Sequence, residues 1–178
     1  NGTMIGELGQ VTLVLALLIA VCLSSLPLIG AWNRDERLIA TAPSLAVGLF
    51  VFNALAFGLL AAGFLVDDFT IRYVATNSNL LLPWYYKISA IWGGHEGSLL
   101  LWMLMLSGWM LAVVMLSGPL PKVFRARVLA VMGMVTLGFL AFTVFTSNPF
   151  DRILPTVPDG NDLNPLLQDP GMIFHPPL

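Results

Sequence analysis

Charged residues stand in a few short clusters, and the uncharged stretches between them constrain the fold more than any other feature. Four stretches contain no Asp, Glu, Lys or Arg: residues 8–33, 38–66, 97–121 and 128–150. A helix needs about 20 residues to cross ~30 Å of hydrocarbon, so each stretch is long enough to span a bilayer. Only 10% of the residues are charged, whereas a soluble domain has about 25%. The pattern predicts an all-α polytopic membrane helical bundle.

The four predicted transmembrane helices cover residues of about 8–31, 40–66, 97–117 and 126–147. They leave two short connections and two long loops, residues 67–96 and 148–178. The first helix is not a cleavable signal peptide, because no basic residue precedes it and its apolar run exceeds the ~7–15 residues of such a segment. Residues 1–3 are interpreted as a tag remnant or upstream extension, and residues 4–178 as the N-terminal four-helix segment of a larger protein.

Basic residues are concentrated in the two short connections. Five of the eight Lys and Arg residues lie there: Arg34, Arg37, Lys122, Arg125 and Arg127. Cytoplasmic loops carry an excess of such residues. Both termini and both long loops are therefore predicted to be periplasmic, with the protein in a bacterial inner membrane. The net charge of −2 argues against a nucleic-acid partner, and the single cysteine, Cys22, provides no CxxCH motif for haem attachment.

Small residues recur at every fourth position on two of the predicted spans. They are Ala16, Ala20 and Ser24 on the first span, and Ala54, Gly58 and Ala62 on the second. Such stripes let helix backbones approach closely in lipid, so both are predicted to face neighbouring helices. Asn53 is predicted to hydrogen-bond to another helix, although a place on a transport pathway stays open. No ionisable residue lies mid-span, which argues against an ion or proton conduit.

The most unusual stretch is "SAIWGGHEGSLLLW", residues 89–102, where polar residues adjoin a long apolar run. Around it, residues 84–92 are rich in Trp and Tyr and carry one lysine, which predicts a short helix in the lipid headgroup layer. The glycine pair that follows ends this helix and allows a bend into the third span. His95 and Glu96 are then expected at the corner, on the outer side of the membrane.

Two interpretations of this corner stay open. Glu96 can be a favourable charge at a helix start, with His95 its neighbour in an interfacial hydrogen-bond network. Alternatively, His95 is a cofactor ligand or a proton-handling group, and Trp92 beside it belongs to the same cofactor-binding site. Polar residues are ordinary at the ends of membrane spans, so spacing alone favours the first interpretation.

The tail after the fourth span contains seven prolines and enough apolar residues to form an ordered, irregular loop, with a helical turn around "NPLLQ". Its closing "FHPPL" places two prolines after His175, which suits the first turn of a helix beginning there. The positive end of a helix disfavours imidazolium, and neutral imidazole is the form that binds iron. His175 is therefore a candidate haem axial ligand; the alternative is a histidine packed at a loop–helix junction.

Several long, contiguous motifs resemble one known family. "WGGHEGSLLLW" (92–102), "TSNPFDR" (146–152) and "LNPLLQDPGMIFHPPL" (163–178) are similar to the N-terminal part of the CcmF/NrfE family, membrane proteins of cytochrome c maturation. The likeness runs from Met4 to Leu178 and includes "DDFTIRYVATNSN" and "PWYYK". Motifs of this length are far more specific than a spacing pattern.

This resemblance implies a haem-handling function. Members of the family are polytopic inner-membrane proteins that receive haem from a periplasmic haem chaperone. They act as haem lyases, attaching haem to the CxxCH thiols of apocytochrome c, with thiol-handling maturation subunits as further partners. The cofactor would be the transient substrate haem, b-type before attachment, and His175 would be one of its two periplasmic axial ligands. The resemblance implies no ligand role for His95.

The resemblance also implies that parts of the family's site lie elsewhere. Its tryptophan-rich haem-binding segment, its second periplasmic histidine and the histidines of a structural haem are expected beyond Leu178. This chain alone is therefore expected to be inactive as an enzyme. Two other functions stay open: a segment of a haem transporter, which would need a polar route through the spans, and a structural assembly subunit that docks partner proteins without binding haem.

Overall fold

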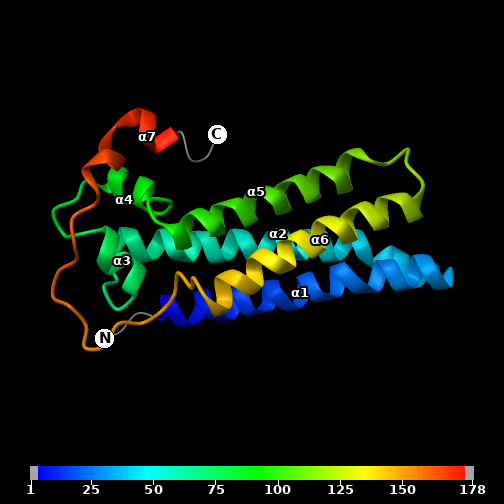
Figure 1. The fold of residues 1–178 in the computed structure, drawn as a ribbon, viewed down its shortest axis with the longest axis horizontal. Coiled ribbons are helices and arrows are strands. Elements are labelled where there is room, and N and C mark those ends of the chain that lie inside the picture. The colour runs from blue at the N-terminus through cyan, green and yellow to red at the C-terminus, as the bar shows by residue number, and fades with distance from the viewer. Residues whose placement is uncertain (1–3, 175–178) are drawn as a thin grey trace.

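The computed structural model describes residues 4–174 and is built from helices, four of which are long and lie side by side (Figure 1). The long helices are α1 (Ile5–Asn33), α2 (Glu36–Leu65), α5 (His95–Leu116) and α6 (Lys122–Phe145). All four are long and apolar enough to cross a bilayer, so the predicted all-α architecture with four spans is confirmed. Among the described residues, β-structure is limited to one isolated bridge, between Ile71 and Arg152.

Each long helix begins a few residues before the span predicted for it, because polar residues continue the helix outside the apolar stretch. At the start of α2, the Asp35 carboxylate accepts a hydrogen bond from the backbone N–H of Arg37 at 2.9 Å. Such an N-cap satisfies a backbone donor that has no partner within the helix. Hydropathy locates the apolar part of a helix, whereas the first residue of α2 is set by its cap; the other three long helices begin without a side-chain cap.

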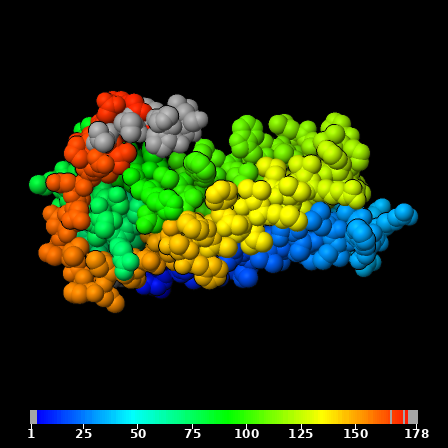
Figure 2. Space-filling model, in the orientation of Figure 1, coloured from blue at the N-terminus to red at the C-terminus, as the bar shows by residue number. Residues whose placement is uncertain are grey.

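Because the long helices alternate in direction, both long loops gather at one end of the bundle (Figure 1). This end carries four short elements: α3 (Arg72–Asn77), α4 (Trp84–Ala90), the 3-10 helix η1 (Pro165–Gln168) and α7 (Pro170–Phe174). We call residues 66–94 and 146–174 the cap, which covers that end of the molecule (Figure 2). The opposite end, the short-connection end, has residues 34–35 and 117–121 between its helices. Which side of the membrane each end faces stays a prediction.

Two of the four short elements, α4 and η1, fall where the sequence predicted them, whereas α3 and α7 were not predicted. α4 occupies most of the stretch expected as a short helix near residues 84–92, and η1 is the turn expected around "NPLLQ". That α4 lies along the membrane surface stays a prediction. On its outer side, Trp84 and Tyr85 are 65% and 52% exposed, as an interfacial helix rich in aromatic residues requires.

The two predicted stripes of small residues have opposite outcomes. Ala16, Ala20 and Ser24 of α1 are buried, as predicted. The stripe on α2 is wrong: Ala54 and Ala62 are half-buried, and a Cβ added at Gly58 would meet no described atom within 4 Å. The buried small residues of α2 are instead Ala42, Ala46, Ala56 and Gly63. A helix in lipid is apolar on every side, so small residues alone do not distinguish the protein-facing side from the lipid-facing side.

Asn53 makes the interhelical contact predicted for it. Its side chain is buried in α2, and its amide nitrogen lies 3.4 Å from the carbonyl oxygen of Met103 and 3.3 Å from Oγ of Ser107, both in α5. The amide oxygen has no hydrogen-bond partner among the described residues. Asn53 therefore joins α2 to α5 by long, partial hydrogen bonds, which are typical of amides that link membrane helices.

Candidate functional site

The corner between α4 and α5 is built around Tyr73 of α3, which is almost completely buried. The Tyr73 hydroxyl donates a hydrogen bond to the carbonyl oxygen of Ile91 at 3.0 Å and accepts one from the backbone N–H of Gly94 at 2.9 Å. Burial raises the pKa of this hydroxyl, so it stays protonated and able to donate. Ser98 closes the turn by donating its hydroxyl to the carbonyl oxygen of Trp92 at 2.8 Å.

The expected bend is present, but its glycines are needed for space and not for backbone freedom. No glycine among the described residues has a positive φ. A Cβ added at Gly97 would lie 1.6 Å from the carbonyl oxygen of Ile91, and one at Gly94 would lie 2.8 Å from the Tyr73 ring. Contacts below 3.0 Å are essentially never seen for real Cβ atoms. The start of α5 is therefore pressed directly against the end of α4.

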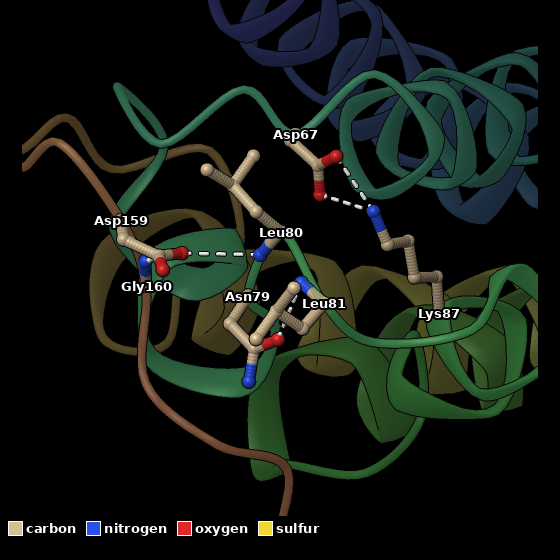
Figure 3. Close-up of polar contacts among 7 residues, drawn as sticks. All are labelled: Asp67, Asn79, Leu80, Leu81, Lys87, Asp159 and Gly160. Carbon is tan, nitrogen blue, oxygen red and sulfur yellow. Dashed lines mark hydrogen bonds and ion pairs between the residues drawn. The ribbon is translucent and has the colours of Figure 1, made fainter.

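An ion pair fastens α4 to the end of α2 (Figure 3). The Lys87 ammonium lies 2.5 and 2.6 Å from the two carboxylate oxygens of Asp67, and the two side chains are 8% and 19% exposed. The Lys87 side chain is therefore buried against the end of α2, where Asp67 binds it. Asp67 itself has a left-handed backbone, with φ of 56°, at the point where the chain turns away from α2.

The tail is held along the connection between α2 and α5. The Asp159 carboxylate accepts a hydrogen bond from the backbone N–H of Leu80 at 3.0 Å (Figure 3). The Asn79 amide donates to the carboxylate of Asp162 at 2.5 Å. Closer to the bundle, Arg152 pairs with Glu7 of α1 and bonds to the Thr70 hydroxyl. As far as residue 174 the tail is therefore ordered and irregular, as predicted.

The end of the tail reaches the corner through Trp92. The indole N–H of Trp92 donates a hydrogen bond to the carbonyl oxygen of Ile173 at 3.0 Å. Next to it, the Leu167 side chain packs so closely that a Cβ at Gly93 would lie 2.8 Å from it. Ile173 is two residues before His175, which lies outside the described residues, so the structure does not test its predicted role. Trp92 contacts the segment that leads to His175.

His95 is exposed on the outer side of the corner. The hydrogen-bond partner of its side chain is Ser147 and not the neighbouring Glu96. Its Nδ1 lies 3.1 Å from the Ser147 hydroxyl, just past the end of α6, and its ring meets Phe142 edge to face at 5.8 Å. His95 also lines a groove of about 490 Å³ between α5 and α6 whose other walls are apolar, including Leu99, Val135 and Phe139. This contact between α5 and α6 belongs to the interfacial hydrogen-bond interpretation of His95.

Among the described residues, a histidine could act as an axial ligand of haem iron, but no group of side chains could form another kind of metal site. A porphyrin supplies four iron ligands, so the protein needs to add one or two. With Nδ1 of His95 bonded to Ser147, Nε2 is left without a hydrogen bond among the described residues, beside an apolar groove. No group of three or more His, Cys, Asp or Glu side chains in the described chain could hold a metal ion. The described residues therefore offer one imidazole nitrogen for an axial position on a haem iron and no cluster of side chains for a bare metal ion.

Sequence reasoning missed Tyr73 and the pairing of Asp67 with Lys87. Asp67 directly follows the second apolar stretch, and Lys87 is the one basic residue of the Trp- and Tyr-rich helix. Opposite charges at the two ends of one connection were the available signal. The sequence around Tyr73 contains no such signal, because a tyrosine in a polar loop looks the same in sequence whether its hydroxyl is buried or solvated.

The known proteins similar to this chain all have cytochrome c in their descriptions. A family model described as cytochrome C assembly protein matches residues 92–178. The chain is 60% identical to the cytochrome c-type biogenesis protein CcmF of Pseudomonas aeruginosa and 55% identical to that of Escherichia coli K12, over 98% of this chain and 27% of each relative. The solved structure of a cytochrome c heme lyase CcmF matches 85% of this chain and 25% of that chain, with a TM-score of 0.79 and 28% identity. The chain thus spans about a quarter of the length of these relatives.

Proposed function

The chain belongs to the CcmF/NrfE family of cytochrome c-type biogenesis proteins, and we propose that its cap handles haem during cytochrome c biogenesis. In this proposal His175 is an axial ligand of a transient haem that is then joined to the CxxCH thiols of apocytochrome c. The observation that carries it is the hydrogen bond from Trp92 to the carbonyl oxygen of Ile173. This contact holds Ile173, two residues before His175, against the corner at the start of α5.

Each residue of the corner has its own part in this proposal. Haem brings the iron and the vinyl groups to which substrate thiols add. His175 binds the iron through a neutral imidazole nitrogen. Trp92 is a positioning residue, since its indole holds the tail and reaches haem only through it. His95 holds the start of α5 against the end of α6 through Ser147, and its Nε2 is the one other imidazole nitrogen that the described chain offers to a haem.

The proposal places the cap in the periplasm of a bacterium with the bundle in the inner membrane. Five basic residues lie in the two short connections at the opposite end, whereas the two much longer loops of the cap contain three, Arg72, Lys87 and Arg152. Such an excess of Lys and Arg in short loops is typical of the cytoplasmic side. In that orientation the cap faces the periplasmic haem chaperone, apocytochrome c and the thiol-handling maturation subunits that the family implies.

Cysteine labelling tests this orientation. In a Cys22→Ser background, Leu81→Cys places a thiol on a cap residue that is 91% exposed, and Leu120→Cys places one at the short-connection end. A membrane-impermeant maleimide added to spheroplasts should label Leu81→Cys and leave Leu120→Cys unlabelled until the membrane is opened. The reverse pattern would place the cap in the cytoplasm and reject the proposal.

The haem assignment is tested in the full-length protein, produced in a strain that lacks its own copy. His175→Ala should abolish the haem absorbance that depends on the cap and reduce cytochrome c yield. Trp92→Phe keeps an aromatic ring but loses the indole N–H, and should lower both only in part. His95→Gln introduces an amide that can hydrogen-bond to Ser147 in place of the imidazole, and should leave both close to normal.

Normal haem content and normal cytochrome c yield in His175→Ala would favour a structural assembly subunit. Loss of haem in His95→Gln with an intact fold would assign the iron contact to His95 instead. A transporter segment has less support, because the polar residues buried among the described parts of the long helices are Asn53 and a few hydroxyls such as Ser107 and Thr136.

A further inference from the structure

A groove between α5 and α6 at the short-connection end has a composition that no part of the proposed haem function uses. Its volume is about 650 Å³, and its walls are almost entirely apolar. Trp109, Leu116, Leu120 and Phe124 line it, and all four side chains are exposed. In a membrane-spanning bundle, a groove on this outer surface meets lipid or another apolar chain.

One charged residue, Arg125, also lines this groove. The same residue lines a smaller cavity of about 140 Å³ between α2 and α6, together with Lys122. Arg125 is half-buried, and neither cation forms an ion pair with a carboxylate among the described residues. A guanidinium that is partly removed from water costs free energy unless an anion accompanies it. The described residues thus supply two cations here, and no carboxylate among them pairs with either one.

The positions along α6 give the site a direction. Lys122 is the first residue of α6, so the two cations lie at the end of the span, where headgroups are expected. The groove continues from Arg125 past Val128 to Met132. At 1.5 Å per residue this is about 10 Å along the helix, into the hydrocarbon layer. The site therefore has a cationic mouth at the membrane edge and an apolar channel that leads inward.

We propose that this groove binds one anionic phospholipid of the surrounding leaflet. Its phosphate pairs with Arg125 and Lys122, and one acyl chain lies along Val128 and Met132. Basic pockets between membrane helices on the side with excess positive charge favour anionic headgroups, and this end has five basic residues against Asp35 and Glu36. A free phosphate would use the cations but leave the apolar channel empty.

The second groove between the same two helices provides an internal comparison. It lies at the capped end, has a comparable volume of about 490 Å³ and is apolar apart from His95. No lysine or arginine lines it. The two grooves are comparable in volume but differ in charge, so a preference for anionic lipid is expected at the short-connection end alone.

The test is lipid binding to the full-length protein purified in detergent, measured by native mass spectrometry. The probes are dioleoyl phosphatidylglycerol and, as the neutral comparison, dioleoyl phosphatidylcholine. The wild type should retain the anionic lipid preferentially. Arg125→Gln should weaken this binding about fivefold, since Arg125 lines the groove and one basic residue beside an anionic headgroup contributes about that factor. Val128→Trp fills the channel without changing charge and should weaken it as well.

Arg127→Gln is the matched control, because Arg127 is exposed on the same turn of α6 and lines neither groove. It should leave the binding of both lipids unchanged, and helical circular dichroism should be the same in all variants. Equal binding of the two lipids by the wild type would overturn the proposal. So would an equal loss in Arg127→Gln, unchanged binding in Val128→Trp, or a groove already filled by other helices of the full-length protein.

Discussion

The cap and the membrane bundle use different interactions although they belong to one fold. In the cap, polar groups are paired at short range: Tyr73 joins two backbone segments, and Lys87 pairs with Asp67. In the bundle, the long helices pack through small and apolar side chains, and the amide of Asn53 makes two long hydrogen bonds with its oxygen left without a partner among the described residues.

The difference follows from what surrounds each region. Outside the hydrocarbon, water competes for every polar group, so a loop is held only by contacts that exclude water and satisfy the backbone. Inside it, lipid is as apolar as the side chains, so close packing of helices does most of the work. Variants in the cap should therefore change stability far more than polar variants in the bundle.

The largest effect is expected for Gly97→Ala. The new Cβ would lie 1.6 Å from the carbonyl oxygen of Ile91, so the corner could close only by moving α4 away from α5. We expect a loss of about 4 kcal/mol or more, a cost reserved for severe steric conflict, measured by thermal or denaturant unfolding in detergent. Gly108→Ala in the same helix is the control, since its Cβ would meet Phe50 at an ordinary 3.8 Å. Equal stability of the two variants would show that the corner is not tightly packed.

Lys87→Met should have the next largest effect. It leaves the Asp67 carboxylate, which is only 19% exposed, without its cation. Removing one member of a buried pair costs about 3 kcal/mol. The double variant Asp67→Asn/Lys87→Met should lose less than the sum of the single variants, because no unpaired charge remains. Arg72→Met, an exposed cap residue, should change stability by less than about 0.5 kcal/mol; additive effects at positions 67 and 87 would argue against a coupled pair.

Tyr73→Phe should cost about 1–3 kcal/mol, because the buried carbonyl of Ile91 loses its donor. Burial raises the pKa of the Tyr73 hydroxyl, so the folded state binds this proton more tightly than the unfolded state. The contribution of Tyr73 is therefore complete below the ordinary pKa of about 10 and is lost as the pH rises above it. Unfolding measured between pH 8 and 11 should show a steeper loss in the wild type than in Tyr73→Phe. Parallel curves would mean that Tyr73 is not buried.

The smallest effect is expected for Asn53→Leu in the bundle. Hydrogen bonds between membrane helices are worth roughly 0.6 kcal/mol on average, and those of Asn53 are long. Replacing the amide by an apolar side chain of similar size should change stability by less than about 1 kcal/mol, and it removes an unsatisfied amide oxygen. A loss as large as that of Lys87→Met would erase the distinction between cap and bundle.

The number of spans could be predicted from sequence because the free energy of inserting a helix into lipid depends on its composition and length. The short aromatic helix and the turn at "NPLLQ" were also predicted, for a local reason: proline suits a helix start, and the glycine pair ends the aromatic helix. The buried face of α2 could not be predicted, since Gly58 and Ala46 have the same chemistry and only the position of a neighbouring helix separates them. The position of the corner was predicted correctly. The hydrogen bond of His95 to Ser147 was not predicted, because it joins residues 52 positions apart in the chain.

The sequence by itself determined that the chain has four membrane-spanning helices with its charged residues concentrated outside the apolar stretches, because charge and hydropathy fix which segments can enter hydrocarbon. Tertiary structure alone decided which polar groups meet, such as Lys87 with Asp67 and Trp92 with Ile173. It also placed Arg125 beside an apolar groove. These pairings depend on distances between segments that are remote in the chain, and one-dimensional patterns contain no such distances.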